Sequence, residues 1–267
     1  MISFETLLDD MADKRRLAQW PSAEYTCHQA SSYDRESKAP NPKDGEFRPE
    51  SGRDWGKGWF ANRDFNQFIR SESCDGRTEY VMMEDSGPGC IVRFWNALGG
   101  DAWKQSGTIR VYLDGNPRPE IEMTTKKLIG GEGLVRSPFS YLASDAKTKP
   151  EWRGRNMYLP IPYAKGCKIT WDGQYDESLS TLFYYHVNYR KYAPGTSVET
   201  FTMEQLKAAE ELLKTTALKL RQPKLESRVS AVLSAANTTL APEEPVELRH
   251  DNEECIQSIS MKLAAED

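Results

Sequence analysis

The middle of the chain consists of short apolar or alternating runs separated by turn residues, and this pattern limits the fold more than any other feature. Asp114 and Gly115 follow one run, and Asp172 and Gly173 follow another. Asp-Gly next to apolar runs is a strong hairpin signal. Many short strands joined by such turns predict an all-β protein, and a jelly-roll β-sandwich is the expected fold. The predicted strands are 79–83, 90–95, 108–113, 118–123, 168–171 and 182–189.

Two helices are expected at the borders of this β region. Apolar residues recur at helical spacing over 4–11, before Trp20 and Pro21 end the pattern, which predicts one short N-terminal amphipathic helix. Thr202 and Gln205 form a capping box that opens a second helix over about 203–221. Its apolar stripe is expected to pack against a sheet or a neighbouring subunit, and it contains Leu206, Leu213 and Leu220.

The domain organisation follows from changes in composition along the chain. Residues 1–200 are expected to form a first jelly-roll domain with the N-terminal helix and a long polar loop over 25–59. Residues 201–254 hold the linker helix and a linker. Residues 255–267 alternate like a new strand, which cannot bury its apolar face alone, so it either joins the first sheet or begins a second, incomplete jelly roll. We adopt the second interpretation.

Charge and composition exclude several classes of protein. The 35 Lys and Arg against 40 Asp and Glu give 35 − 40 = −5, and no basic face indicates nucleic acid as a partner. The sequence has no apolar run of about 18 residues and no leader-like start. We therefore expect a cytoplasmic location and no membrane partner. The five cysteines are odd in number and contain no CxxC, which fits reduced thiols better than disulfides or zinc.

The long polar loop and the segment after it carry the residue types that suit a polyol. Carboxylates, amides and guanidinium groups match sugar hydroxyls, and aromatic rings stack on the apolar C–H faces of a sugar. The alternative is structural, with the tryptophans fixing the loop to the sheet and Asp34 and Arg35 forming a solvated pair. The candidates from this region are Tyr33, Asp34, Arg35, Trp59, Asn62 and Asp64.

Other chemistry-bearing patterns are weaker. The Gly-Pro-Gly turn at 87–89 is interpreted as the start of a core strand, with Arg93 and Trp95 on one face and Val92 and Phe94 on the other. The glycines at 130–133 lack the spacing of a nucleotide-binding loop. The histidines are too scattered for a metal cluster or a Ser-His-Asp triad, and neither a metal nor a cofactor is expected; they are His28, His186 and His250. His186 is interpreted as a structural histidine on a core strand, and Asp34, Asp64 and Asp85 are candidates for a catalytic carboxylate pair.

Six blocks in combination resemble the domain-of-unknown-function 2961 family, whose characterised members form glycoside hydrolase family 172. The blocks are SSYDR at 31–35, WFANRDFNQFIR at 59–70, DSGPGCIVRFW at 85–95, IRVYLDG at 109–115, YLPIPYAKGCKIT at 158–170 and YYHVNYRKYAPGT at 184–196. The resemblance implies two jelly-roll domains, assembly as a trimer or hexamer, and retaining hydrolysis of furanosides of the fructofuranoside or arabinofuranoside type.

The same resemblance places both catalytic glutamates in the second jelly roll, beyond the part of the family pattern that this chain matches. We therefore assign no catalytic residue here and expect the chain alone to be inactive. The resemblance implies that the chain supplies part of the sugar pocket through Tyr33, Asp34, Arg35, Trp59, Asn62, Asp64 and Trp95. The competing hypothesis is a non-catalytic carbohydrate-binding or assembly module with a single jelly roll.

Overall fold

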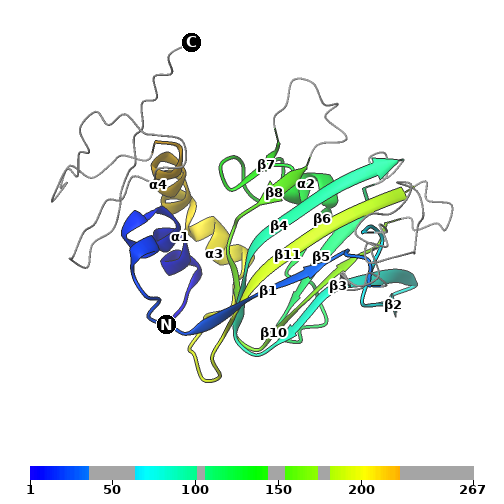
Figure 1. Cartoon of the computed structure of the whole chain (residues 1–267), viewed down its shortest axis with the longest axis horizontal. Coiled ribbons are helices and arrows are strands. Elements are labelled where there is room, and N and C mark those ends of the chain that lie inside the picture. The colour runs from blue at the N-terminus through cyan, green and yellow to red at the C-terminus, as the bar shows by residue number, and fades with distance from the viewer. Residues whose placement is uncertain (36–63, 101–105, 144–153, 174–180, 223–267) are drawn as a thin grey trace, which may run out of the picture.

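The computed structural model describes residues 1–35, 64–100, 106–143, 154–173 and 181–222, and these form a sandwich of two antiparallel sheets with helices at one end (Figure 1). The all-β prediction is confirmed. The first sheet has the order β1 (Tyr25–Ser31), β11 (Thr181–Tyr192), β4 (Gly89–Gly100), β8 (Arg155–Met157) and β7 (Ser140–Leu142), and β9 (Ile161–Tyr163) also pairs with β4. The second sheet has the order β2 (Arg70–Cys74), β3 (Arg77–Ser86), β10 (Gly166–Trp171), β5 (Thr108–Leu113) and β6 (Ile121–Thr124).

The core lies between the two sheets and is rich in aromatic rings. Trp171 of the second sheet and Phe183 of the first are both fully buried, and their ring centroids lie 4.4 Å apart. Phe68 stacks on Trp171 at 5.6 Å and on Tyr185 at 6.0 Å. Large rings each bury a large apolar area, so this cluster is a main source of the stability of the sandwich.

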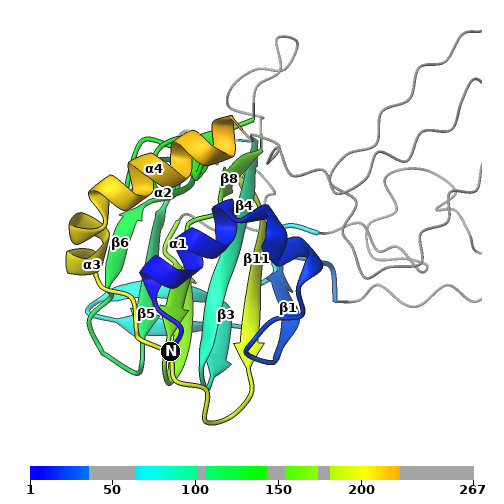
Figure 2. The same ribbon diagram turned by 90° about the vertical axis from the view of Figure 1, so that its left-hand side faces the viewer.

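The N-terminal helix and the two C-terminal helices lie together at one end of the sandwich (Figure 2). Helix α1 (Phe4–Ala12) begins at a capping box formed by Ser3 and Thr6, and a 3₁₀ helix η1 (Lys14–Ala18) follows it. Phe4 packs edge-on against Phe201 at 5.2 Å, so the predicted N-terminal helix adds its apolar face to the core. The short helix α2 (Thr125–Ile129) contacts β6, β7 and β8. None of the helices in the described ranges is long and apolar enough to span a membrane.

The predicted helix over 203–221 is two helices, α3 (Met203–Ala208) and α4 (Glu210–Arg221), which meet at Ala209. Its capping box is confirmed: the N–H of Gln205 donates to the hydroxyl of Thr202 at 3.2 Å. Leu206 is buried and the rest of the predicted stripe is partly buried against the core, so the stripe packs within this domain. The predicted linker and the predicted strand over 255–267 lie outside the described residues.

The prediction of an irregular stretch from residue 25 is wrong for its first part, which forms β1. This strand pairs along its whole length with β11. Most of its side chains are exposed because it lies at the edge of the sheet, so it carries no apolar alternation to reveal it. Residues 36–59 of the same predicted loop lie outside the described residues.

Candidate functional site

The candidate site begins where β1 ends and a second segment takes its place beside β11. The N–H of Ser32 donates to the carbonyl of Tyr185 at 3.1 Å, and the N–H of Tyr185 donates to the Ser32 hydroxyl at 3.1 Å. Two residues further along β11, the N–H of Asn66 donates to the carbonyl of Phe183 at 3.0 Å. The edge of the sheet is therefore shared by two chain segments that are far apart in the sequence.

The backbone of Asp34 and the carboxylate of Asp64 meet at this junction. The backbone N–H of Asp34 donates to Oδ1 of Asp64 at 2.8 Å, and the Ser32 hydroxyl donates to the carbonyl of Asp64 at 2.6 Å. Asp34 is only 2% exposed, so it is not part of a solvated pair. We call Ser32, Asp34 and Asp64 the carboxylate corner.

Tyr33 and Arg35 flank the corner and form a stacked pair. Tyr33 is 56% exposed, and the guanidinium carbon of Arg35 lies 5.0 Å from its ring centroid. An exposed ring with a cation above it is a surface that can accept the apolar face of a sugar. The other two candidates of this region, Trp59 and Asn62, lie outside the described residues.

Trp95 and His186 lie next to each other on the outer face of the first sheet. The two residues pair across β4 and β11, and their ring centroids are 4.9 Å apart. Both are partly exposed, whereas the neighbouring Phe94 and Tyr185 point into the core. His186 lies on a core strand, as expected, but its side chain is on the outward face of that strand.

The charge of Asp64 connects the carboxylate corner to this pair of rings. Burial lowers the pKa of His186 below its usual 6.5 and the charge of Arg93 lowers it further, while Asp64 acts in the opposite direction. Asp64 also contributes, after burial, to the raised pKa of Tyr184. His186 is thus a neutral ring at neutral pH, able to stack on a sugar and to exchange a hydrogen bond with a hydroxyl.

Gly154 makes room for the indole of Trp95. A Cβ atom at position 154 would lie 2.8 Å from Nε1 of Trp95, closer than such contacts normally come. The partly exposed position of Trp95 therefore depends on a glycine in the neighbouring chain segment, immediately before β8.

Asp85 is held elsewhere and does not join the other two candidate carboxylates. Its carboxylate accepts a hydrogen bond from the Tyr163 hydroxyl at 2.9 Å and forms an ion pair with Lys191 at 2.9 Å. Lys191 is six residues along β11 from Tyr185, which corresponds to roughly 20 Å of extended strand. Asp85 therefore has a structural role at the opposite end of the sheet from the carboxylate corner.

Val92 and Phe94 were predicted to lie on the same face of the strand. Phe94 is buried in the main core, but Val92 is only partly buried. The pairing of β4 with β11 shifts by one residue, because Asn188 pairs with Arg93 while Tyr189 pairs with Ile91. Val92 is left between these pairs and packs against a small separate cluster that includes Cys90. A bulge of this kind redirects the side chains on one side of it.

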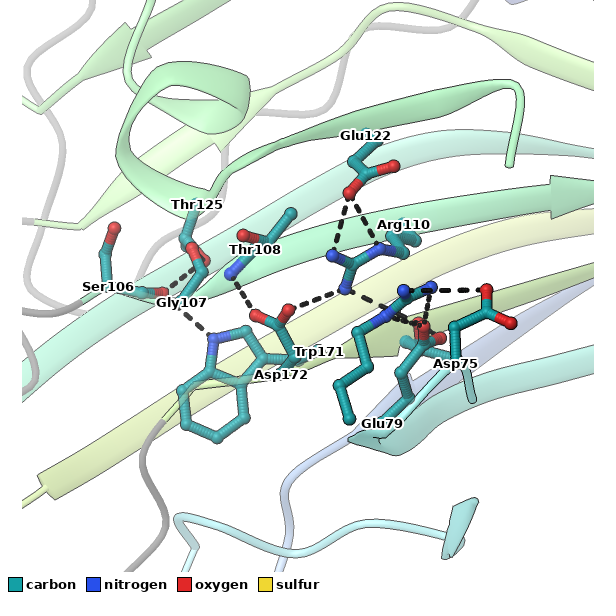
Figure 3. Close-up of polar contacts among 12 residues, drawn as sticks. Asp75, Glu79, Ser106, Gly107, Thr108, Arg110, Glu122, Thr125, Trp171 and Asp172 are labelled. Carbon is teal, nitrogen blue, oxygen red and sulfur yellow. Dashed lines mark hydrogen bonds and ion pairs between the residues drawn. The ribbon is translucent and has the colours of Figure 1, made fainter. Parts of the chain in front are cut away.

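A second polar cluster lies on the outer side of the other sheet, around Glu79 and Arg110 (Figure 3). Glu79 is fully buried and accepts hydrogen bonds from the hydroxyls of Tyr112 and Thr170 and from the Arg77 guanidinium. Burial alone would raise the pKa of Glu79, but these hydrogen bonds outweigh burial and hold it below 4.5.

The charge of Arg110, like that of Glu79, is paired with neighbouring side chains. Its guanidinium lies between Glu122 and Asp172, at 2.8 and 2.7 Å (Figure 3). The other oxygen of Asp172 accepts the N–H of Thr108 at 2.7 Å. A network in which these charges already have partners stabilises the sheet and leaves no reactive group for a substrate.

Within the described ranges, no group of three or more His, Cys, Asp or Glu side chains could hold a metal ion. The cysteines Cys90 and Cys167 are buried, and burial raises the pKa of both thiols, that of Cys90 to about 12. These thiols are therefore protonated and unreactive at neutral pH.

The fold and the corner together define an all-β sandwich domain that gathers carboxylate, hydroxyl and ring groups at one edge of a sheet. Residues 23–209 match the family model of the first β-sandwich domain of glycoside hydrolase family 172, and the chain belongs to this family. The resemblance found in the six sequence blocks is thereby confirmed. A comparison with curated proteins found no match.

Three polar residues beside the candidate site were not among the predicted site residues. They are Arg93, Asn156 and Asn188. They come from three different strands, and only the strand pairing brings them together. The only local indication of their role was the prediction that Arg93 and Trp95 lie on the same face of one strand.

Proposed function

We propose that this chain is the sugar-holding first domain of a glycosidase that cleaves furanosides with retention of configuration, and that the two catalytic glutamates lie in a further domain. Membership of glycoside hydrolase family 172 supports the reaction class. The observation that carries the proposal is the carboxylate corner, in which the Asp64 carboxylate holds the backbone of Asp34 and its charge acts on His186 of the Trp95–His186 ring pair.

The corner suits a sugar ring on chemical grounds. A retaining glycosidase uses one carboxylate to attack the anomeric carbon and another to transfer the proton, and the remaining groups hold the ring. Asp64 can accept a hydrogen bond from a sugar hydroxyl, and Trp95 can cover a C–H face. Fixing the ring in this way lowers the entropy cost of reaching the transition state.

Two buried carboxylates among the described residues are already engaged, which supports a catalytic pair located elsewhere. Glu79 and Asp85 are both occupied by hydrogen bonds and ion pairs, so neither is suited to attack a sugar. The matched family model is that of a first sandwich, which supports placing the glutamates in another one. By the same resemblance we propose a homo-oligomer, a trimer or hexamer, as the working form.

The test is hydrolysis of p-nitrophenyl α- and β-furanosides by this chain and by a longer protein that extends to the end of its natural reading frame. We expect activity only in the longer protein, and we expect Asp64→Asn in that protein to raise KM more than it lowers kcat. Rapid hydrolysis by the 267-residue chain would place the catalytic pair inside it. An inactive but folded longer protein would favour the non-catalytic binding module.

A further inference from the structure

A row of polar side chains crosses four strands on the outer face of the first sheet, next to the carboxylate corner. Nδ2 of Asn188 on β11 donates to Oε1 of Gln29 on β1 at 2.9 Å. Arg93 on β4 donates to the amide oxygens of Asn188 and Asn156, each at 3.3 Å. Gln29, Asn188, Arg93 and Asn156 thus form one hydrogen-bonded row, which we call the amide row.

Aromatic rings lie beside the amide row. The Arg93 guanidinium lies 5.9 Å from the ring centroid of Tyr158, and that ring stacks on Tyr141 at 6.3 Å. On the other side of Arg93 along β4 is the Trp95–His186 pair. Trp95 in turn pairs across the strands with Asn156, so rings and amides alternate over the surface.

The charge on this face favours a neutral polyol as the ligand. Arg93 is the one charged member of the amide row, and its guanidinium is already hydrogen-bonded to two amides. Amides that donate and accept, placed between rings, are the groups that recognise sugar hydroxyls and C–H faces. An anionic ligand would require free cationic groups, and the amide row offers amides instead.

The amide row is longer than one sugar ring. Neighbouring strands lie about 4.8 Å apart, so three steps from β1 to β8 span roughly 14 Å. Its nearer end lies on the same strand as the carboxylate corner, since Gln29 is three residues before Ser32, roughly 10 Å of extended strand.

We propose that the amide row and Tyr158 bind the sugar units that follow the first one, so that the preferred ligand is an oligosaccharide of several furanose units. This inference rests on the proposed function, because the corner is taken to hold the first unit. The competing occupant of the face is a second copy of this chain, which the same experiment distinguishes.

The experiment measures the affinity of the 267-residue chain for oligosaccharides of increasing length by calorimetry. The probes are β-2,1-linked fructose oligomers and α-1,5-linked arabinose oligomers of one, two and four units. For one of the two series we expect the affinity to rise roughly tenfold between one and four units, the amount expected from one additional good contact.

Two variants test the face and one serves as the control. Arg93→Gln and Tyr158→Leu should both remove the gain with length. Tyr158→Leu should in addition leave the affinity for one unit unchanged. Arg70→Gln is the matched control, since Arg70 is an exposed arginine of the other sheet, and it should change neither affinity. Circular dichroism of each variant checks that the fold is intact.

The outcomes separate this inference from the proposed function. Binding of one unit with no gain for four units would overturn the inference and leave the proposed function intact. Absence of binding for every probe would count against both. An oligomer of the wild-type chain that dissociates in Arg93→Gln during sedimentation would show the face to be an interface between copies, which also overturns the inference.

Discussion

The carboxylate of Asp64 accepts a 2.8 Å hydrogen bond from the backbone N–H of Asp34, 30 residues earlier in the chain. The bond joins the end of β1 to the segment that replaces it at the sheet edge. The position of the candidate site therefore depends on this bond together with the 2.6 Å hydrogen bond from the Ser32 hydroxyl to the carbonyl of Asp64, which joins the same two segments.

Asp64→Ala should lower the free energy of unfolding by about 1–2 kcal/mol, because a hydrogen bond to a charged group is lost at a partly buried position. Asp64→Asn keeps an acceptor oxygen and should retain most of the stability while losing the charge beside His186. Urea unfolding measures the first effect and sugar affinity the second. Equal stability of Asp64→Ala and the wild type would contradict the structural role of the contact.

His186 should titrate below pH 6.5, because burial and the charge of Arg93 lower its pKa. The unfolded chain then binds more protons than the folded chain just below pH 6.5. The stability that His186 contributes is complete above 6.5 and is lost as the pH falls towards the folded-state pKa. Histidine ¹³C chemical shifts followed with pH measure this pKa.

Arg93→Gln provides the control for His186. Removal of the neighbouring positive charge should move the His186 titration to higher pH, and His186→Gln should remove the corresponding slope from the curve of stability against pH. A midpoint at or above 6.5 in the wild-type chain would show that the ring is solvated.

Glu79→Ala should destabilise the sandwich by about 3–5 kcal/mol, the usual cost of removing one partner from a buried ion pair. The pKa of Glu79 is held below 4.5, so its stabilising effect is present above pH 4.5 and is lost as the pH falls through the folded-state pKa. The acid-unfolding midpoint of the variant should therefore lie at higher pH. Glu122→Ala is the matched control with a small expected effect, because the Glu122 side chain is 51% exposed.

Leu213→Asp should lower stability by about 1.5–3 kcal/mol, the value of burying a leucine side chain, since Leu213 packs against the core. Leu218→Asp on the same helix should have little effect, because Leu218 is 60% exposed. Thermal unfolding of the two variants compares them directly. An unchanged melting temperature for Leu213→Asp would mean that the helical stripe does not pack as the structure shows.

The sequence was sufficient to predict the strands that bury one face, because their alternation is a local property of two-residue period. Residues 182–189 illustrate this, since the predicted run lies within β11 and its first side chains alternate between buried and partly exposed. The edge strand β1 was missed because its side chains are mostly exposed. A local sequence pattern reveals a strand through the side chains that the strand buries. An exposed edge strand buries few side chains, so its sequence lacks this pattern.

The candidate site could be predicted only in part, because much of it depends on long-range strand pairing. Asp34 and Asp64 were found because they belong to recognisable sequence blocks. The amide row depends on the pairing of β1 with β11, β11 with β4 and β4 with β8, which joins residues as distant as Gln29 and Asn188. No short-range spacing encodes such a surface, so it becomes visible only when the sheet order is known.

The shared sheet edge has a consequence for how members of this fold can differ. Ser32 and Asn66 are held at positions 185 and 183 of the same strand, so the chain that leaves the sheet at one point returns beside it. The entropy of closing such an excursion rises by only about 0.6 kcal/mol for each doubling of its length. Insertions and deletions between these two anchors therefore cost little, and the sandwich itself can stay unchanged while the length of chain at this edge varies.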